Sequence, residues 1–96
     1  MIDKKQRIIL RGIASKTKST VIVGKEGFTE NILKAIEEEL FLHELVKINV
    51  LQNTEIIDKT KLCEIATLLN ADVVTAIGRK IVLYKYSDKK NINHIL

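Results

Sequence analysis

The chain alternates between apolar patterns typical of helices and apolar patterns typical of strands. Apolar residues recur with helical spacing in 3–15, 29–42 and 55–69. Short β-branched or alternating stretches occupy 20–23, 45–51, 71–77 and 81–86. The predicted order is therefore α-β-α-β-α-β-β. A helix between two strands predicts that the strands are parallel neighbours, and the turn at 78–80 makes the last two strands a hairpin. We expect a single α/β domain with three helices and a mixed four-stranded sheet.

Side chains at the helix starts and on the helix faces refine this picture. Asp3 and Thr29 each precede a helix and can accept a bond from its first backbone N–H groups. The predicted buried face of the second helix comprises Phe28, Ile32, Leu33, Ile36 and Leu40. In the first helix we expect the core face to comprise Gln6, Ile9 and Ile13, widened by Ile8, Leu10 and Ala14. After a turn at 52–54, the third helix is expected to bury Ile57, Leu62, Ile65, Ala66 and Leu69, with Cys63 as an inert core thiol.

Length and composition limit the class of protein. The 96 residues, 46% hydrophobic, suffice for one core, which we place at about 3–86, with 87–96 as a flexible tail. No apolar run approaches the roughly 20 residues that span a membrane, and no apolar signal-peptide segment opens the chain. One cysteine forms no internal disulfide, and the absence of a Cys/His cluster argues against a metal site. We expect a cytoplasmic monomer with no cofactor and no membrane partner.

Charge is distributed unevenly along the chain, whose net charge is +4. Residues 1–25 carry seven Lys or Arg against one Asp, a net charge of +6. Residues 26–46 carry six Glu against one Lys, a net charge of −5, and residues 71–96 return to +3. Such a dipolar domain is expected to orient on a polyanion such as RNA, with its glutamate-rich face turned away.

A G-x-x-G sequence follows the first predicted strand and precedes the second helix. We call its residues, Gly24, Lys25, Glu26 and Gly27, the glycine loop. Glycines let a backbone turn sharply and approach a ligand, and the N–H groups that open a helix favour an anion. Lys25 adds a positive charge at the tip. The loop is therefore a candidate phosphate-binding site, although a plain turn accounts equally for so short a motif.

The sequence offers no catalytic constellation. The glycine loop lacks the spacing of a P-loop and of a dinucleotide-binding fingerprint. Glu37, Glu38 and Glu39 occupy consecutive helical positions, so they point in different directions and predict a solvated face. His43 precedes Glu44 without a placed nucleophile, and at a helix end it suits the dipole. We therefore expect no enzyme and no small-molecule substrate.

Two tyrosines near the end of the last strand leave two interpretations open. Tyr84 and Tyr86 are two residues apart and are expected on one face, with Lys85 opposite. They could stack on unpaired bases or pack under a helix with their hydroxyl groups exposed.

Four segments of the chain, in order, resemble the CRM domain, and especially its bacterial stand-alone form, the YhbY family. The segments are Leu10-Arg11-Gly12-Ile13-Ala14, 21–30 with the glycine loop, His43-Glu44-Leu45-Val46-Lys47-Ile48, and 77–85. The resemblance runs from about Lys5 to Tyr86. Two departures are Ser19-Thr20, where the family usually has a proline before the first strand, and Lys85, where arginine is common.

This resemblance implies a fold similar to the C-terminal domain of bacterial translation initiation factor three, with a G-x-x-G loop that takes part in RNA binding. It also implies a role for stand-alone bacterial members with precursors of the large ribosomal subunit. We therefore expect a non-catalytic protein that binds structured rRNA in ribosome biogenesis. The alternative is an adaptor that docks a basic ribosomal protein on the acidic helix face around Glu37–Glu39.

The candidate RNA-binding residues form three groups. The first is the glycine loop. The second, which we call the helix patch, comprises Lys4, Lys5, Arg7, Arg11, Lys16 and Lys18. The third comprises Arg79, Lys80 and Lys85, which extend the surface only if the hairpin lies on the same side.

Overall fold

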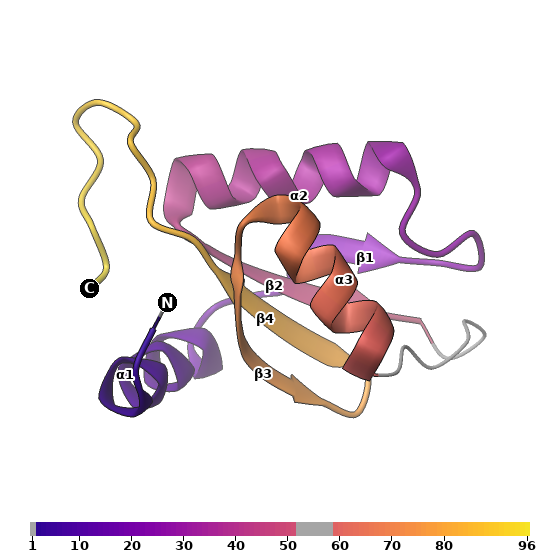
Figure 1. Ribbon diagram of the computed structural model, residues 1–96, viewed down its shortest axis with the longest axis horizontal. Coiled ribbons are helices and arrows are strands. Elements are labelled where there is room, and N and C mark those ends of the chain that lie inside the picture. Colours follow the sequence, from indigo (N-terminus) through magenta and orange to yellow (C-terminus); the bar gives the residue numbers. More distant parts are fainter. Residues whose placement is uncertain (1, 52–58) are drawn as a thin grey trace.

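The computed structural model describes residues 2–51 and 59–96, and its elements follow the predicted order (Figure 1). They are α1 (Lys4–Ser15), β1 (Val21–Val23), α2 (Glu30–His43), β2 (Leu45–Val50), α3 (Lys59–Leu69), β3 (Asp72–Ile77) and β4 (Lys80–Tyr84). The expected turn at 52–54 and the expected first turn of the third helix, including Ile57, lie outside the described residues. No helix in the described part of the chain is long and apolar enough to cross a membrane.

The four strands form one mixed sheet in the order β1-β2-β4-β3. β1 pairs with β2 in parallel, whereas β4 is antiparallel to both β2 and β3. The mixed sheet and the terminal hairpin are therefore confirmed. The expectation that every helix connects neighbouring parallel strands is wrong for α3, because the hairpin strand β4 lies between β2 and β3.

Helices cover both faces of the sheet. α2 and α3 pack on one face, over a core that includes Val23, Ile36, Leu40, Ile48, Ile65 and Leu83. α1 packs on the opposite face, over a smaller cluster of Leu10, Ala14, Leu45, Val74, Val82 and Tyr84. α1 lies at one end of this second face, and the glycine loop extends from the other end of the sheet (Figure 1).

Both predicted helix caps form. The side chain of Asp3 accepts a bond from the backbone N–H of Gln6 at 2.8 Å, and Gln6 Oε1 accepts one from the N–H of Asp3 at 3.1 Å. Thr29 Oγ1 accepts a bond from the N–H of Ile32 at 3.2 Å. The predicted stripe of α2 is also confirmed, because Ile36 and Leu40 are buried and the other members pack against the same core.

The predicted core face of α1 is confirmed for Leu10, Ala14 and Ile13 and wrong for Ile8 and Ile9. Ile8 and Ile9 are 59% and 47% exposed, whereas Leu10 and Ala14 are buried. Residues 8–10 are apolar without interruption, so periodicity alone leaves the buried side undetermined. Arg7 lies one turn before Leu10 on the stripe that faces the sheet and is half-buried.

Cys63 is exposed, which contradicts its expected place in the core. The buried stripe of α3 comprises Leu62, Ile65, Ala66 and Leu69. Cys63 directly follows Leu62, about 100° further around the helix, and therefore projects away from the sheet.

Lys47 fastens the C-terminal end of α1 to the sheet. Its Nζ donates to the backbone carbonyl oxygen atoms of Ala14 at 3.1 Å and Thr17 at 3.2 Å. The last carbonyl groups of a helix have no partner within it, and the negative end of the helix dipole favours a cation there. A lysine on β2 thus adds to the bonds that the backbone N–H groups of Lys16 and Thr17 already make to the last carbonyl groups of α1.

Glu44 joins the end of α2 to the C-terminal segment of the chain. It is fully buried and adopts a left-handed conformation, with φ of 64°. Its carboxylate accepts bonds from the backbone N–H groups of Ser87 at 2.7 Å and Ile95 at 3.1 Å, and lies 2.7 Å from Nδ1 of His94. The segment 87–96, expected to be a flexible tail, is therefore held against the domain at these residues. Nothing in its polar sequence indicates these contacts.

These partners keep the buried carboxyl group ionised. Burial by itself raises the pKa of Glu44, but the bonds from Ser87, His94 and Ile95 outweigh burial and hold the pKa below its usual value. A carboxyl group whose pKa is lower in the folded state contributes stability above its unfolded pKa. That contribution is lost as the pH falls through the folded-state pKa.

We expect Glu44→Gln to lower the free energy of unfolding by about 2 kcal/mol at neutral pH, because a buried amide replaces a charged acceptor of several bonds. The advantage of the wild-type protein should shrink as the pH falls below about 4.3, the ordinary carboxyl pKa. Urea unfolding of both proteins from about pH 5.5 to about pH 3 measures this difference. A stability difference that stays constant over this range would contradict the role of the ionised carboxylate.

Glu44→Gly separates the carboxylate from the backbone conformation. Glycine adopts positive φ without the roughly 1 kcal/mol that another residue incurs there. We nevertheless expect this variant to be less stable than the wild-type protein, since three donors lose their acceptor. A more stable Glu44→Gly protein would mean that backbone strain outweighs the carboxylate bonds.

Candidate nucleic-acid interface

The glycine loop forms a tight turn between β1 and α2. The N–H of Gly27 donates to the carbonyl of Gly24 at 2.9 Å, and the N–H of Thr29 donates to the carbonyl of Gly27 at 3.0 Å. The turn leads directly into the capped start of α2. Lys25 and Glu26 at its tip are both exposed. The loop therefore presents one cation and one carboxylate to solvent beside the N-terminus of a 14-residue helix.

The two glycines of this loop differ in what they require. Gly27 has φ of +75°, a conformation that side chains other than glycine and asparagine adopt at a cost. Gly24 has no positive φ, and a Cβ there would meet only Leu51 Cδ1, at an ordinary 3.9 Å. Only Gly27 is thus required by the backbone of the turn.

The β3–β4 turn lies at the same end of the sheet as the glycine loop. The N–H of Val50 donates to the carbonyl of Arg79 at 2.7 Å, and the N–H of Leu51 donates to the carbonyl of Val23 at 2.9 Å. The Arg79 guanidinium donates to the carbonyl of Leu51 at 2.7 Å. Leu51 thus connects the ends of β1 and β2 with the hairpin turn, so Arg79 and Lys80 lie near the glycine loop.

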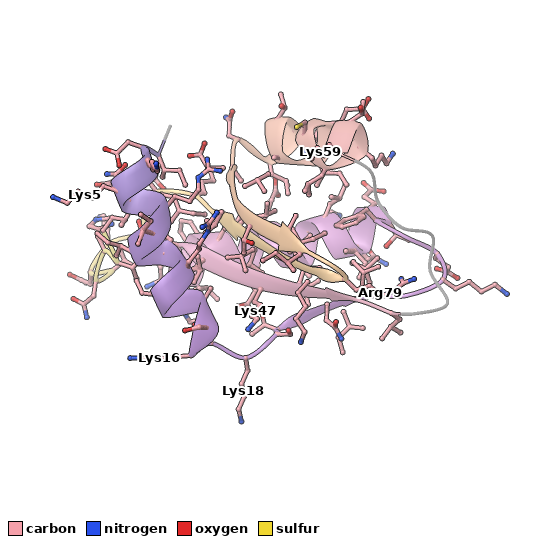
Figure 2. The ribbon with its side chains drawn as sticks, turned by 90° about the horizontal axis from the view of Figure 1, so that it is seen from below. Lys5, Lys16, Lys18, Lys47, Lys59 and Arg79 are labelled. Carbon is pink, nitrogen blue, oxygen red and sulfur yellow. The ribbon has the colours of Figure 1, made fainter. Side chains whose placement is uncertain are left out.

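The helix patch lies at the opposite end of the domain, around α1 and the segment that leads into β1. Lys4, Lys5, Arg11, Lys16 and Lys18 are exposed, whereas Arg7 is half-buried. Figure 2 shows Lys16, Lys18 and Lys47 on the side of the sheet away from α3, with Lys59 on the α3 side. The acidic residues Glu37 and Glu38 are exposed on α2, which covers that other face. The exposed glutamates of α2 therefore lie on the face opposite α1, together with the exposed Lys34, Lys59 and Lys61.

Lys85 is separated from the other two hairpin residues. It follows the end of β4 that lies beside Glu44, and its backbone N–H donates to the Glu44 carbonyl at 3.0 Å. The hairpin thus contributes Arg79 and Lys80 at the glycine-loop end of the sheet and Lys85 at the α1 end. The structure does not bring these three residues together in one group.

The two tyrosines occupy different environments and do not share one face of the strand. Tyr84 is buried in the cluster beneath α1, where burial and then the negative charge of Glu44 raise its pKa. Tyr86 lies beyond the end of β4, is 64% exposed, and stacks on His94 with ring centroids 4.5 Å apart. Packing therefore accounts for Tyr84. The ring of Tyr86 is exposed, and His94 already covers one of its faces.

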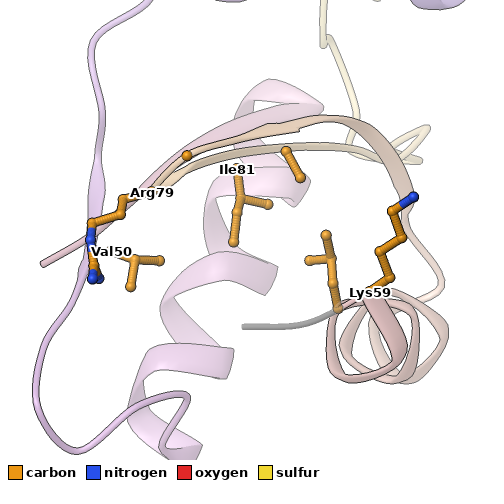
Figure 3. Close-up of a pocket in the computed structure, with 7 residues that line it drawn as sticks. Val50, Lys59, Arg79 and Ile81 are labelled. Carbon is orange, nitrogen blue, oxygen red and sulfur yellow. The ribbon is translucent and has the colours of Figure 1, made fainter. Parts of the chain in front are cut away.

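A small pocket opens on the α3 side of the glycine-loop end (Figure 3). Its volume is about 120 Å³, and its lining comprises Val50, Lys59, Leu62, Ala76, Gly78, Arg79 and Ile81. The lining is mostly apolar, with Arg79 and Lys59 on opposite sides (Figure 3). Within residues 2–51 and 59–96, no cluster of His, Cys, Asp or Glu could hold a metal ion.

Sequence reasoning omitted Lys47 and Asn49 from the candidate residues. Both lie on the face of β2 that α1 partly covers, because Val46, Ile48 and Val50 between them pack on the other face. The alternation of apolar and polar residues in this strand was the available signal.

Comparison with known proteins identifies the family to which this fold belongs. Residues 2–85 match the model of the CRS1 / YhbY (CRM) domain. The chain is 40% identical over 88 residues to the Bacillus subtilis "Probable RNA-binding protein YqeI", covering 91% of each chain. It is 32% identical over 91 residues to a Haemophilus influenzae protein named "RNA-binding protein", covering 95% of this chain and 92% of that one.

A solved structure has the same fold. The solution structure of the hypothetical protein SAV1595 from Staphylococcus aureus, proposed to be an RNA binding protein, matches with a TM-score of 0.70 and 33% identity. The match covers 95% of both chains. These relatives are named for binding RNA and not for catalysis. With a family model that spans nearly all of the chain, this protein belongs to the CRS1 / YhbY (CRM) domain family.

Proposed function

We propose that this protein is a non-catalytic RNA-binding protein that grips structured rRNA through the glycine loop and its basic residues. One observation carries the proposal. The helix patch and the exposed Lys80 lie on the side of the sheet opposite α2 and α3, and the glycine loop and hairpin turn lie at one end of the same sheet. A polyanion laid across this side from α1 to the glycine loop would meet cations at both ends.

Each part has a separate role in this proposal. Gly27 holds the turn that brings the loop backbone toward a phosphate, and Lys25 neutralises that phosphate. Lys4, Lys5, Arg11, Lys16 and Lys18 contact phosphates further along the RNA, with Lys80 between the two regions. Arg7 and Lys85 are half-buried and contribute at the margin.

The identity of the RNA rests on the family. Its stand-alone bacterial members are associated with precursors of the large ribosomal subunit, so we propose that this protein acts as a monomer in assembly of that subunit in the cytoplasm. Crosslinking in cells, followed by sequencing of the attached RNA, tests this assignment. Enrichment of large-subunit rRNA precursors supports it. A complex with a ribosomal protein that survives nuclease treatment, without crosslinked rRNA, would favour the adaptor alternative.

Salt dependence tests the electrostatic part of the proposal. With about four to six phosphate contacts, log K against log salt should have a slope of about −3 to −5. Fluorescence anisotropy with a structured rRNA fragment at several salt concentrations measures the slope. A flat salt dependence would contradict a surface that binds through its cations.

Substitutions in the glycine loop test its role directly. Lys25→Ala should weaken binding to all RNA sequences alike and reduce the salt slope by about one contact. Gly27→Asp should bind more weakly still, because it places a carboxylate beside the start of α2. Binding is measured by anisotropy, after circular dichroism has confirmed folding.

Gly27→Asn is the matched control. Asparagine tolerates the positive φ at this position and adds no charge, so this variant should retain most of the affinity. If folded Lys25→Ala and Gly27→Asp proteins both bind like the wild-type protein, the loop is only a turn.

A further inference from the structure

Four residues form a transverse row across the sheet on the face that α1 only partly covers. Ile22 pairs with Asn49, Asn49 pairs with Lys80, and Lys80 pairs with Ile77. Directly paired residues in adjacent strands project to the same face. We call the row formed by Ile22, Asn49, Lys80 and Ile77 the strip. It crosses all four strands, a span of about 14 Å at the usual strand spacing.

The strip faces away from α2 and α3. Val21, Val23, Ile48, Val50 and Ile81 flank it along the strands, and all of them are buried in the core beneath those helices. Successive side chains of a strand alternate between faces, so the strip projects to the opposite side. α1 covers that side only where Leu45, Val82 and Tyr84 lie, toward the other end of the sheet.

The two ends of the strip are apolar and uncovered. Ile22 is 56% exposed on the edge strand β1, and Ile77 is 76% exposed on the edge strand β3. Between them lie the half-buried amide of Asn49 and the exposed ammonium of Lys80. Neither isoleucine belongs to the core, so both side chains are available to contact a ligand that crosses the sheet.

The surroundings of the strip favour a polyanion. Lys80 belongs to the strip itself. The Arg79 turn and the glycine loop lie beside the strip at one end of the sheet, and Lys18 and Lys47 lie toward α1 (Figure 2). The strands contain one acidic residue, Asp72, which pairs with Tyr84 at the α1 end of the sheet. Charge complementarity therefore favours a polyanion, and a nucleic-acid strand adds the apolar base faces and hydrogen-bonding base edges that match the isoleucines and the Asn49 amide.

The chemistry of the strip distinguishes between paired and unpaired RNA. An A-form duplex is bound mostly through phosphates and 2′-hydroxyl groups, and its stacked bases expose little apolar surface. An unpaired nucleotide exposes the flat face of its base, the apolar edge of its ribose and the hydrogen-bonding edge of the base. Two exposed isoleucines on either side of an amide can contact all three.

We propose that the strip binds unpaired nucleotides next to a structured RNA held by the glycine loop and the basic residues. Ile22 and Ile77 contact the apolar faces of base and ribose, the Asn49 amide bonds a base edge, and Lys80 pairs with the intervening phosphate. This inference rests on the proposed RNA-binding function and adds to it a class of ligand, an RNA helix with an adjoining single strand.

The test compares two RNA probes that differ only in unpaired nucleotides. One is a blunt RNA duplex, and the other is the same duplex with a single-stranded 3′ extension of mixed sequence. The wild-type protein should bind the extended probe more tightly by about tenfold, which corresponds to roughly 1.4 kcal/mol. Anisotropy titrations at one salt concentration give both dissociation constants.

Ile22→Thr combined with Ile77→Thr removes the apolar contacts without altering charge, and threonine keeps the β-branched shape that suits a strand. This variant should bind the extended probe about as weakly as the blunt duplex, and its affinity for the blunt duplex and its salt slope should be unchanged. Leu68→Ser on α3 is the matched control. Leu68 is 69% exposed on the other side of the sheet, so its substitution should preserve the preference for the extended probe.

The outcomes separate this inference from the proposed function. If the wild-type protein binds neither probe, the RNA-binding function fails. Equal binding of both probes by the wild-type protein overturns the role of the strip and leaves RNA binding intact. Equal losses on both probes in the folded variant would also overturn it, because the strip would then contact duplex RNA.

A second measurement uses the wild-type protein alone and does not depend on a folded variant. With 4-thiouridine in the 3′ extension, ultraviolet crosslinks should map to peptides that contain Ile22 or Ile77. Crosslinks confined to α3 or to the 87–96 segment would overturn the assignment.

Discussion

The antiparallel pairing of β2 with β4 is the contact on which the other features depend. At one end of this pair, the N–H of Val50 bonds to the carbonyl of Arg79, which holds the hairpin turn beside the glycine loop. At the other end, the N–H of Lys85 bonds to the carbonyl of Glu44, which directs the chain past the end of α2. The same pairing aligns Asn49 with Lys80. A slip of one residue would leave Lys80 and Asn49 on opposite faces, so this register sets the row of residues across the sheet.

Two charged residues, Lys47 in β2 and Glu44 directly before it, bond to other parts of the protein. A charged side chain in this region is therefore not by itself a sign of an RNA contact. Lys47 is a cation on the basic side, but its ammonium group already bonds to two carbonyl groups at the end of α1. Glu44 is an acid within a buried cluster, and the C-terminal segment satisfies its carboxylate. Each joins one helix end to a segment distant in sequence. A count of Lys and Arg on one side therefore includes Lys47, whose ammonium group already has two partners within the protein.

The order of elements, both helix caps and the buried stripe of α2 could be predicted, because each depends on residues within one or two helical turns. Strand order could not, since the insertion of β4 between β2 and β3 depends on contacts between distant segments. The core face of α1 was predicted too broadly because Ile8, Ile9 and Leu10 are all apolar, and only packing against the sheet selects Leu10. The candidate site likewise combines features that depend on nearby residues with features that depend on distant segments. The glycine loop stands out in the sequence, whereas Ile22 and Ile77 become notable only when pairing aligns them and exposure leaves them uncovered.

The two ends of the described chain lie together, away from the glycine loop. Ile2 and Ile95 pack against the same cluster beneath α1, and Figure 1 shows both termini on one side of a molecule 37 Å in its longest dimension. A linker or affinity tag attached at either terminus would therefore leave the glycine-loop end of the domain unobstructed. The domain can be immobilised on a surface by either terminus with the same outward orientation. Copies joined in tandem by short linkers could each present the glycine-loop end to a common ligand.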